Sequence, residues 1–299
     1  MLVVDNLWKS LSGIEVLKGI SLKVGEGEAV SLLGPNGSGK STLLKVITGI
    51  YLPTKGRVEI EGKDPREARE LFGYVPQEGG LREELSGRQN VCFFSELYSI
   101  PCSKALRVVK ETLEELGISL PLKDPVEKYS GGMKKALTLT IAMVHDPRLL
   151  ILDEPTVALD PSVRRDFWRL VNEYKEEGKG VLFATHYVEE AERYSDRVYI
   201  IYKGKVVAEG SPEELRRLLP RGAIEVEVEE EIDTRKLCEE MGCIAKGKRV
   251  RFLVESPDER VPTVVNELYS RGIKLKSLEV KKPSLEDVFI KLVGEVHEG

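Results

Sequence analysis

The sequence predicts an α/β fold with two domains, a large one over residues 1–220 and a small α+β one over residues 221–299. In the large domain, short apolar strands such as 148–152 and 180–184 flank a helical pattern at 161–177. This alternation is typical of a largely parallel sheet covered by helices on both faces. After a short linker the pattern restarts with alternating apolar and charged residues, which indicates a separate unit.

The first half of the large domain predicts a core that is interrupted by a helical insertion. The apolar run 28–33 indicates a buried strand that ends in a glycine-rich loop, and a helix follows from Ser41 to about Gly49. Strand patterns are then absent over residues 81–145, where helical segments such as 104–116 dominate. We therefore expect a helical subdomain inserted between two strands of the core.

The C-terminal domain is predicted to follow a linker at Pro220-Arg-Gly222. The residues beyond it indicate strands and helices in the order βαββαβ, followed by a terminal helix. This order is typical of a ferredoxin-like domain. Strands are expected at 223–229, at 249–255 after a Lys-Gly-Lys turn, and at 273–280, and helices at 234–241, 261–271 and 284–292.

Composition and charge exclude some classes of protein. The 299 residues carry a net charge of −5 with interleaved signs, which argues against a non-specific nucleic-acid binder. No apolar run approaches the ~18 residues of a membrane span, and the N-terminus lacks the layout of a signal peptide. The four cysteines, which form no CxxC pair, are expected to be free reduced thiols in a cytoplasmic protein: Cys92, Cys102, Cys238 and Cys243.

A phosphate-binding loop follows the first buried strand. The segment Gly34-Pro35-Asn36-Gly37-Ser38-Gly39-Lys40-Ser41 matches the pattern GxxxxGK[ST] between a strand and a helix. Its glycines let backbone N–H groups surround a phosphate, and the helix start adds a positive dipole end. Lys40 would neutralise the β and γ phosphates, the Ser41 hydroxyl would bind Mg²⁺, and Thr42 would touch the α phosphate.

Two carboxylates end the apolar strand 148–152. Asp153 lies where a nucleotide-hydrolysing enzyme needs a metal-holding carboxylate, and Glu154 could act as a general base toward a water molecule. An ordinary acidic turn before Pro155 is the alternative, which the phosphate loop makes the weaker one.

Three further candidates for the nucleotide site are informative only because the phosphate loop is present. Ser130-Gly131-Gly132 is expected to cap a long helix and leave backbone amides open to an anion. Gln77 lies where the core meets the helical insertion and could reach Mg²⁺ or the attacking water. His186 follows a buried strand and could hold the γ phosphate and that water. Taken singly, each also fits a structural role: a capped helix, a loop glutamine and a packed histidine.

Together these motifs resemble the ATP-binding cassette (ABC) ATPases, over residues 1–219 and in the family's order: phosphate loop, Gln77, Ser130-Gly-Gly, Asp153-Glu154, Val157-Ala-Leu-Asp160 and His186. The resemblance implies a P-loop NTPase core of ABC type that binds ATP and Mg²⁺, with Ser41, Gln77 and Asp153 at the metal. It also implies that the Ser-Gly-Gly turn of one subunit closes on the ATP of a second subunit, and that Asp160 communicates across that interface.

Within the family, Tyr129-Ser-Gly-Gly-Met133 and the tail Pro283-Ser-Leu-Glu-Asp-Val-Phe289 resemble the branch that exports drugs, sodium or polysaccharide-type cargo. That resemblance implies a homodimer or pseudo-symmetric heterodimer, attached to polytopic membrane permease subunits at the cytoplasmic face of the membrane, with no nucleic-acid partner. Leu11 stands where the family usually stacks an aromatic ring on adenine, so Leu11 and Val16 would give the base apolar contact only.

Two alternatives to an exporter ATPase stay open at this point. One is a non-transport ABC ATPase of the translation or repair type, against which stand the one phosphate loop and the lack of a long coiled-coil or zinc insertion. The other is an importer ATPase whose C-terminal domain binds a regulatory ligand.

Overall fold

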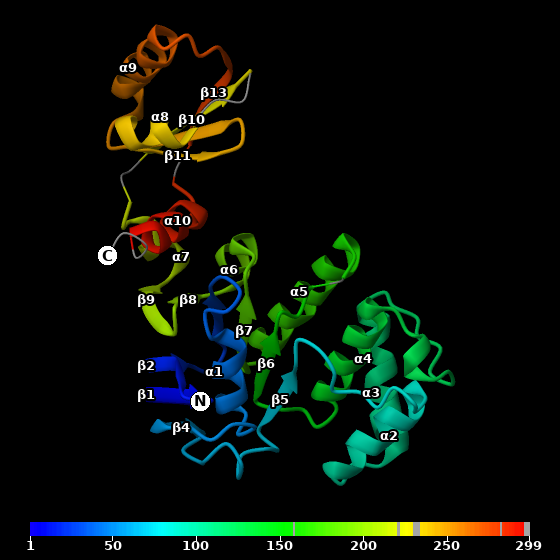
Figure 1. Ribbon diagram of the computed structural model, residues 1–299. Helices are drawn as coiled ribbons and strands as arrows, with labels where there is room; N and C mark the ends of the chain where they lie inside the picture. Colours follow the sequence, from blue (N-terminus) through cyan, green and yellow to red (C-terminus); the bar gives the residue numbers. More distant parts are fainter. Residues whose placement is uncertain (158, 220–221, 230–233, 282, 296–299) are drawn as a thin grey trace. The chain divides into compact units, whose positions relative to one another are not determined.

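The computed structural model describes residues 1–157, 159–219, 222–229, 234–281 and 283–295 (Figure 1). It divides the chain into two compact units, Met1–Glu209 and Gly210–Gly299. The predicted linker residues Pro220 and Arg221 lie outside the described residues, as does Ala158 of the Val157–Asp160 motif. The predicted boundary at residue 220 therefore stays a prediction.

The first unit is built on a six-stranded sheet with the order β5-β6-β7-β3-β8-β9. The neighbours from β5 to β8 pair in parallel, and the four strands in the middle of the order are buried along most of their length because both faces of the sheet are covered. The strands are β3 (Ala29–Leu33), β5 (Phe72–Val75), β6 (Leu149–Asp153), β7 (Gly180–Thr185), β8 (Arg197–Tyr202) and β9 (Lys205–Gly210).

A smaller antiparallel sheet covers one face of this unit. Its order is β2-β1-β4, formed by β1 (Leu2–Leu11), β2 (Ile14–Val24) and β4 (Lys55–Ile60). Helix α1 (Lys40–Ile47) shares one core with both sheets, and its Leu43, Leu44 and Ile47 are fully buried there. Burial of these side chains, at about 1.5–3 kcal/mol each, holds the helix that follows the phosphate loop in place.

The other face of the large sheet is covered by α5 (Pro161–Glu176) and α4 (Gly131–Met143). The ring of Trp168 on α5 lies at an edge-to-face angle to Phe183 of β7, with centroids 4.8 Å apart. The short helix α6 (Val188–Tyr194) follows β7 and packs against it. A parallel sheet covered on both faces is therefore confirmed.

The helical insertion contains α2 (Gly87–Leu97), α3 (Cys102–Glu115), the 3-10 turn η1 (Val126–Lys128) and α4, and lies beside β5 in Figure 1. Ser86 caps α2 through a reciprocal pair of hydrogen bonds with Gln89. The expectation of free thiols is wrong. The turn between α2 and α3 brings Cys92 and Cys102 into a disulfide, and Cys238 and Cys243 form a second one across the end of helix α8 (Thr234–Met241).

The second unit has the ferredoxin-like architecture that the sequence predicts. Its antiparallel sheet has the order β11-β12-β10-β13, and the apolar side chains on one face pack with α8 and α9. Helix α10 packs against α7. The elements are α7 (Pro212–Arg216), β10 (Gly222–Val228), α8 (Thr234–Met241), β11 (Cys243–Lys246), β12 (Arg249–Val254), α9 (Pro257–Ser270), β13 (Leu275–Lys281) and α10 (Leu285–Glu295).

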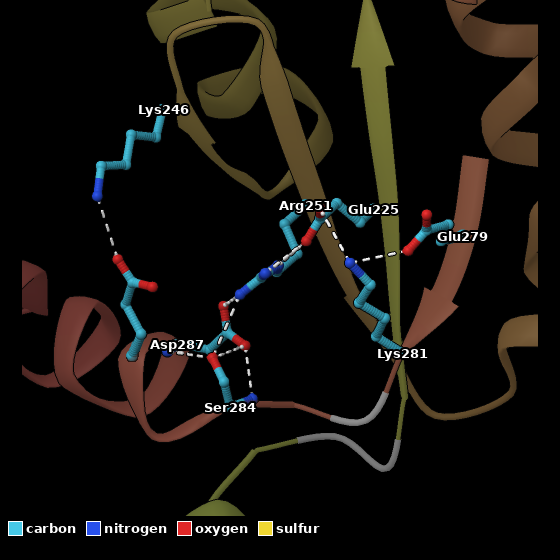
Figure 2. Close-up of polar contacts among 8 residues, drawn as sticks. Glu225, Lys246, Arg251, Glu279, Lys281, Ser284 and Asp287 are labelled. Carbon is cyan, nitrogen blue, oxygen red and sulfur yellow. Dashed lines mark hydrogen bonds and ion pairs between the residues drawn. The ribbon is translucent and has the colours of Figure 1, made fainter. Parts of the chain in front are cut away.

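A charged network joins α10 to this sheet (Figure 2). The guanidinium of Arg251 on β12 contacts Glu225 of β10 at 2.5 Å and Asp287 of α10 at 2.6 Å. Asp287 also accepts hydrogen bonds from the backbone N–H and the hydroxyl of Ser284, both at 2.8 Å. The Asp287 side chain is 1% exposed, so Arg251 neutralises a carboxylate that has almost no access to water.

Within the part of the chain that the structure describes, each helix is too short or too polar to cross a membrane.

Candidate functional site

The phosphate loop forms one wall of a cavity of about 380 Å³ in the first unit. Gly39 has φ +108°, a region that side-chain-bearing residues rarely adopt, and a Cβ there would lie 3.0 Å from a methyl carbon of Leu17. The loop is therefore a narrow cradle that depends on this glycine. The cavity is lined by Val16, Asn36, Gly37, Ser38, Gly39, Lys40, Ser41, Thr42, Gln77 and Glu154.

Lys40 is the buried cation of this cavity, with 5% of its side chain exposed. Its Nζ donates to the carbonyl of Gly34 at 2.7 Å and to that of Pro35 at 3.2 Å, and it lies 3.7 Å from a carboxylate oxygen of Glu154. Burial lowers the pKa of Lys40, whereas Glu154 and then Asp153 oppose that shift. The ammonium thus lies among groups that stabilise its charge and faces the loop's phosphate cradle.

Ser41 and Asp153 meet at the start of α1 and the end of β6. The hydroxyl of Ser41 donates to Oδ1 of Asp153 at 3.1 Å. Burial raises the pKa of Asp153, and the hydrogen bond from Ser41 opposes that shift. A hydroxyl and a carboxylate, both hard oxygen ligands, are suited to Mg²⁺ beside a nucleotide phosphate.

Glu154, which lines the cavity, forms a second polar pair with His186, which follows β7. Nδ1 of His186 and Oε2 of Glu154 are 2.8 Å apart, and Glu154 is 4% exposed. The backbone of Glu154 has φ +47°, in the left-handed region, and its N–H donates to the carbonyl of Ala184 at 3.0 Å. A carboxylate held this firmly beside an imidazole can accept a proton from a water molecule.

The residues present fit a bound triphosphate. The hydroxyl of Ser38 is buried in the loop and, among the described residues, has no hydrogen-bond partner. A phosphate oxygen would satisfy it. Of the two residues expected at the base, Val16 lines the cavity. Leu11 pairs with Ile14 at the end of β1 and is not part of the lining as described.

Gln77 lies between two cavities. It lines the phosphate-loop cavity and also a neighbouring cavity of about 450 Å³ that reaches Gly131 at the start of α4. Ser130 caps α4 by accepting a hydrogen bond from the N–H of Met133 at 3.2 Å, and both Ser130 and Gly131 are exposed. Within the described chain, the Ser130-Gly-Gly turn is not part of the wall around Lys40.

Asp160 is the N-cap residue of α5 and is exposed to solvent. Ala158, two positions earlier in the same motif, lies outside the described residues. The structure thus brings together Lys40, Ser41, Gln77, Asp153, Glu154 and His186, and it places Ser130 and Asp160 at separate helix starts.

One residue near the site was missed by the sequence analysis. Lys135 on α4 donates to the carbonyls of Pro76 at 2.9 Å, Gln77 at 3.4 Å and Asp153 at 3.1 Å. Burial lowers the pKa of Lys135 to about 8, with Asp153 and then Glu154 opposing the shift. The sequence offers only one signal for this residue, namely that Lys135 directly precedes the largely apolar run 136–142, which the structure buries.

Known protein families match both units. The chain matches the family described as "ABC transporter" over residues 17–157 and the family described as "ATP-binding protein DrrA1-3-like, C-terminal domain" over residues 210–293.

Relatives match over nearly the whole chain. The linearmycin resistance ATP-binding protein LnrL of Bacillus subtilis (strain 168) is 32% identical over 98% of each chain. The daunorubicin resistance ATP-binding protein DrrA2 of Streptomyces coeruleorubidus is 33% identical over 93% of this chain and 90% of its own. The Nod factor export ATP-binding protein I of Rhizobium sp. (strain N33) is 33% identical over 97% and 96%.

Solved structures match a large part of the chain, 73% and 71% of it in two examples. A structure described as the ATP binding subunit of an ABC transporter has a TM-score of 0.68 and 32% identity, covering 73% of this chain and 92% of that one. The dimeric structure of MJ0796, a bacterial ABC transporter cassette, has a TM-score of 0.63 and 27% identity, covering 71% and 98%.

Proposed function

Because this chain belongs to the ATP-binding cassette (ABC) transporter family, whose cassettes are ATPases, we propose that it supplies the energy for export through separate membrane subunits. The proposal of export rests on relatives whose names state drug resistance or Nod factor export, and which match both units of this chain. The second unit supports the same branch through its match to the DrrA-like C-terminal domain.

We further propose that two chains share each ATP. The observation that carries this proposal is the position of the Ser130-Gly-Gly turn, which is exposed and lies outside the cavity of its own phosphate loop. A helix start with open amides attracts anions, so the γ phosphate of a second chain's ATP is a fitting partner. The dimeric structure of MJ0796 supports a pair of cassettes, and Asp160 would lie at the interface.

The residues in and beside the cavity then have distinct tasks. Lys40 and the amides of the phosphate loop hold the phosphates, while Ser41, Asp153 and Gln77 would hold Mg²⁺, which supplies further neutralisation of phosphate charge. Glu154 accepts a proton from the attacking water, and His186, which is hydrogen-bonded to Glu154, keeps that water aligned with the γ phosphate.

The cavity next to the phosphate-loop cavity is our candidate binding site for the membrane partner. It is about 450 Å³ in volume and lies between the residues after β5 and the start of α4, beside Gln77. We propose that a short helix of the permease docks there, which would keep the chain peripheral at the cytoplasmic face of the membrane. Movement of Gln77 would then report the state of the nucleotide to the permease.

Replacing Glu154 with Gln tests the shared site. The variant should bind Mg·ATP without turning it over and accumulate as a dimer, which size-exclusion chromatography with and without ATP would detect. The second substitution Ser130→Arg should abolish this dimer by placing a bulky cation at the proposed interface. A wild-type chain that hydrolyses ATP at full rate as a monomer would refute the shared site.

Export itself is tested in membrane vesicles. The chain should co-purify with a polytopic membrane protein, and ATP should drive movement of cargo away from the side on which this chain is bound. Movement toward that side would instead favour an importer.

A further inference from the structure

Lys135 lies where three parts of the first unit converge. It belongs to α4, the helix that Ser130 caps, and its three donated bonds end on the loop after β5 and on the end of β6. An ammonium group has three N–H donors, so these carbonyls use its whole capacity. Beyond the pairing of β5 with β6, which ends at Val75 and Leu152, Lys135 therefore adds a link between the segments that follow these strands.

The carbonyl groups that accept from Lys135 belong to residues beside the nucleotide site. Two of them belong to Gln77 and Asp153, whose side chains face the phosphate loop or its serine. Lys135 therefore holds the backbone of two residues at this chain's own nucleotide. The same residue is five positions after Ser130, which is about 7.5 Å along a helix that rises 1.5 Å per residue.

We propose that Lys135 is a positioning residue that couples the two nucleotide sites of a dimer. In each chain it links the backbone at Gln77 and Asp153, which serve that chain's ATP, to the Ser130-Gly-Gly turn, which serves the partner's ATP. This inference rests on the proposed function, because a turn that closes on a second chain is part of it.

The physical basis is rigidity. Helix α4 is buried from Ala136 to Ala142, so its first turns move as one body with the helix. When the loop at Gln77 moves, the hydrogen bond to Lys135 moves the start of α4 with it, and Ser130 caps that start. Without the ammonium group, three carbonyls lose a charged donor, and the helix start is free to move by fractions of an ångström relative to β6.

The first experiment compares steady-state ATP hydrolysis by the full-length Lys135→Met and Lys135→Arg variants. Met keeps the length of the side chain and removes every donor, so kcat should fall by about 10–100-fold, as for a small misplacement of catalytic groups. The KM for ATP should change far less, because Lys40 and the phosphate loop are untouched. Arg keeps a cation with several donors and should restore most of the lost kcat.

The matched control is Lys175→Met on α5, which lies outside both cavities beside Gln77. The Nζ of Lys175 contacts Asp196 at 3.0 Å, so this change also removes a lysine that holds an acceptor. This variant should keep the wild-type kcat. Thermal unfolding of all three variants shows whether the Lys135→Met protein is folded, and a loss of kcat that Arg does not restore would contradict the positioning role.

The second experiment separates the two halves of the coupling. A chain with an intact Glu154 is mixed, before ATP is added, with a large excess of a Glu154→Gln chain that lends only its Ser130-Gly-Gly turn. Lys135→Met is then placed either on the hydrolysing chain or on the lending chain. Coupling predicts a loss of turnover in both arrangements, and a loss in only one of them overturns it.

Failure of the coupling is distinguishable from failure of the shared site. If the Glu154→Gln chains form no ATP-dependent dimer and never alter the turnover of the intact chain, the proposed shared site is wrong. If they do form a dimer but Lys135→Met leaves kcat unchanged in both arrangements, the shared site stands and the role of Lys135 is refuted.

Discussion

Replacing Arg251 with Met removes the cation that joins helix α10 to the C-terminal sheet. In the native chain its guanidinium contacts Glu225 at 2.5 Å and Asp287 at 2.6 Å, and only 25% of the side chain is exposed. Met keeps much of the aliphatic packing, so the change isolates the loss of charge. The carboxylate of Asp287, 1% exposed, then stays buried without a cation.

The expected magnitude follows from that burial. Breaking a buried ion pair by removing one partner costs about 3–5 kcal/mol. Asp287 keeps its bonds from Ser284, and Arg251 is partly open to water, so the lower end, about 3 kcal/mol, is expected here. For a unit the size of Gly210–Gly299, this corresponds to a fall of roughly 12–24 °C in the melting temperature.

Hydrogen exchange measured by mass spectrometry on the full chain is the suitable assay. In peptides from β10 and β12, the free energy of the opening that allows exchange should fall by about 3 kcal/mol, because Glu225 and Arg251 lie on these strands. Both tryptophans, Trp8 and Trp168, belong to the first unit, so the fluorescence melting curve of that unit should stay unchanged. The control Lys276→Met removes an ion pair to Glu227 whose lysine is 63% exposed, and should cost under about 1 kcal/mol.

The reasoning is refuted if Arg251→Met destabilises the second unit no more than Lys276→Met does. That result would mean that water can stabilise the charge of Asp287 when Arg251 is absent. The double variant Arg251→Met with Asp287→Asn gives a further check, because removing the orphaned charge should recover part of the loss.

Three further outcomes are expected. The hydrogen bond from Arg251 lowers the pKa of Glu225 in the folded protein below its usual 4.5. Ionised Glu225 therefore stabilises the second unit fully above pH 4.5. This stabilisation is lost as the pH falls through the lower pKa of the folded state. Protection measured between about pH 6 and 3 should therefore fall more steeply in the wild type than in Glu225→Gln. Gly39→Ala should weaken ATP binding by more than about tenfold in a fluorescent-nucleotide titration, because its φ is +108° and the added methyl meets Leu17 at 3.0 Å; affinity equal to wild type would contradict the cradle. Ser41→Ala should raise the Mg²⁺ concentration for half-maximal hydrolysis about tenfold while leaving metal-free nucleotide binding intact, and an unchanged Mg²⁺ titration would remove Ser41 from the metal site.

The fold was predictable wherever apolar periodicity and special residues agree. The strand at 28–33 and the helix after Lys40 were both predicted because a glycine-rich loop lies between them, and the structure has β3 and α1 there. Helix α9 was expected from Val261 but begins at Pro257, with Pro262 inside it. A proline within a helix removes a backbone donor, so a sequence argument places the start too late.

What escaped prediction depends on contacts between distant segments. The pairing of Cys92 with Cys102 requires the turn that folds α3 back on α2, and spacing alone does not indicate it. Lys135 acts through backbone carbonyls, which every residue has, so no partner side chain marks it in the sequence. Asp153, Glu154 and His186, by contrast, end neighbouring parallel strands, and such ends meet at one edge of a sheet.

The left-handed backbone of Glu154 affects the free energy of folding as well as the chemistry of the site. A glutamate with φ +47° costs about 1–2 kcal/mol relative to a glycine in the same conformation. A glycine at this position would relieve that backbone cost, but it would leave the buried Lys40 without the carboxylate that lies 3.7 Å from its Nζ. The role proposed for Glu154 as general base, beside His186, would give this position a reason to carry a carboxylate despite the cost of its backbone conformation.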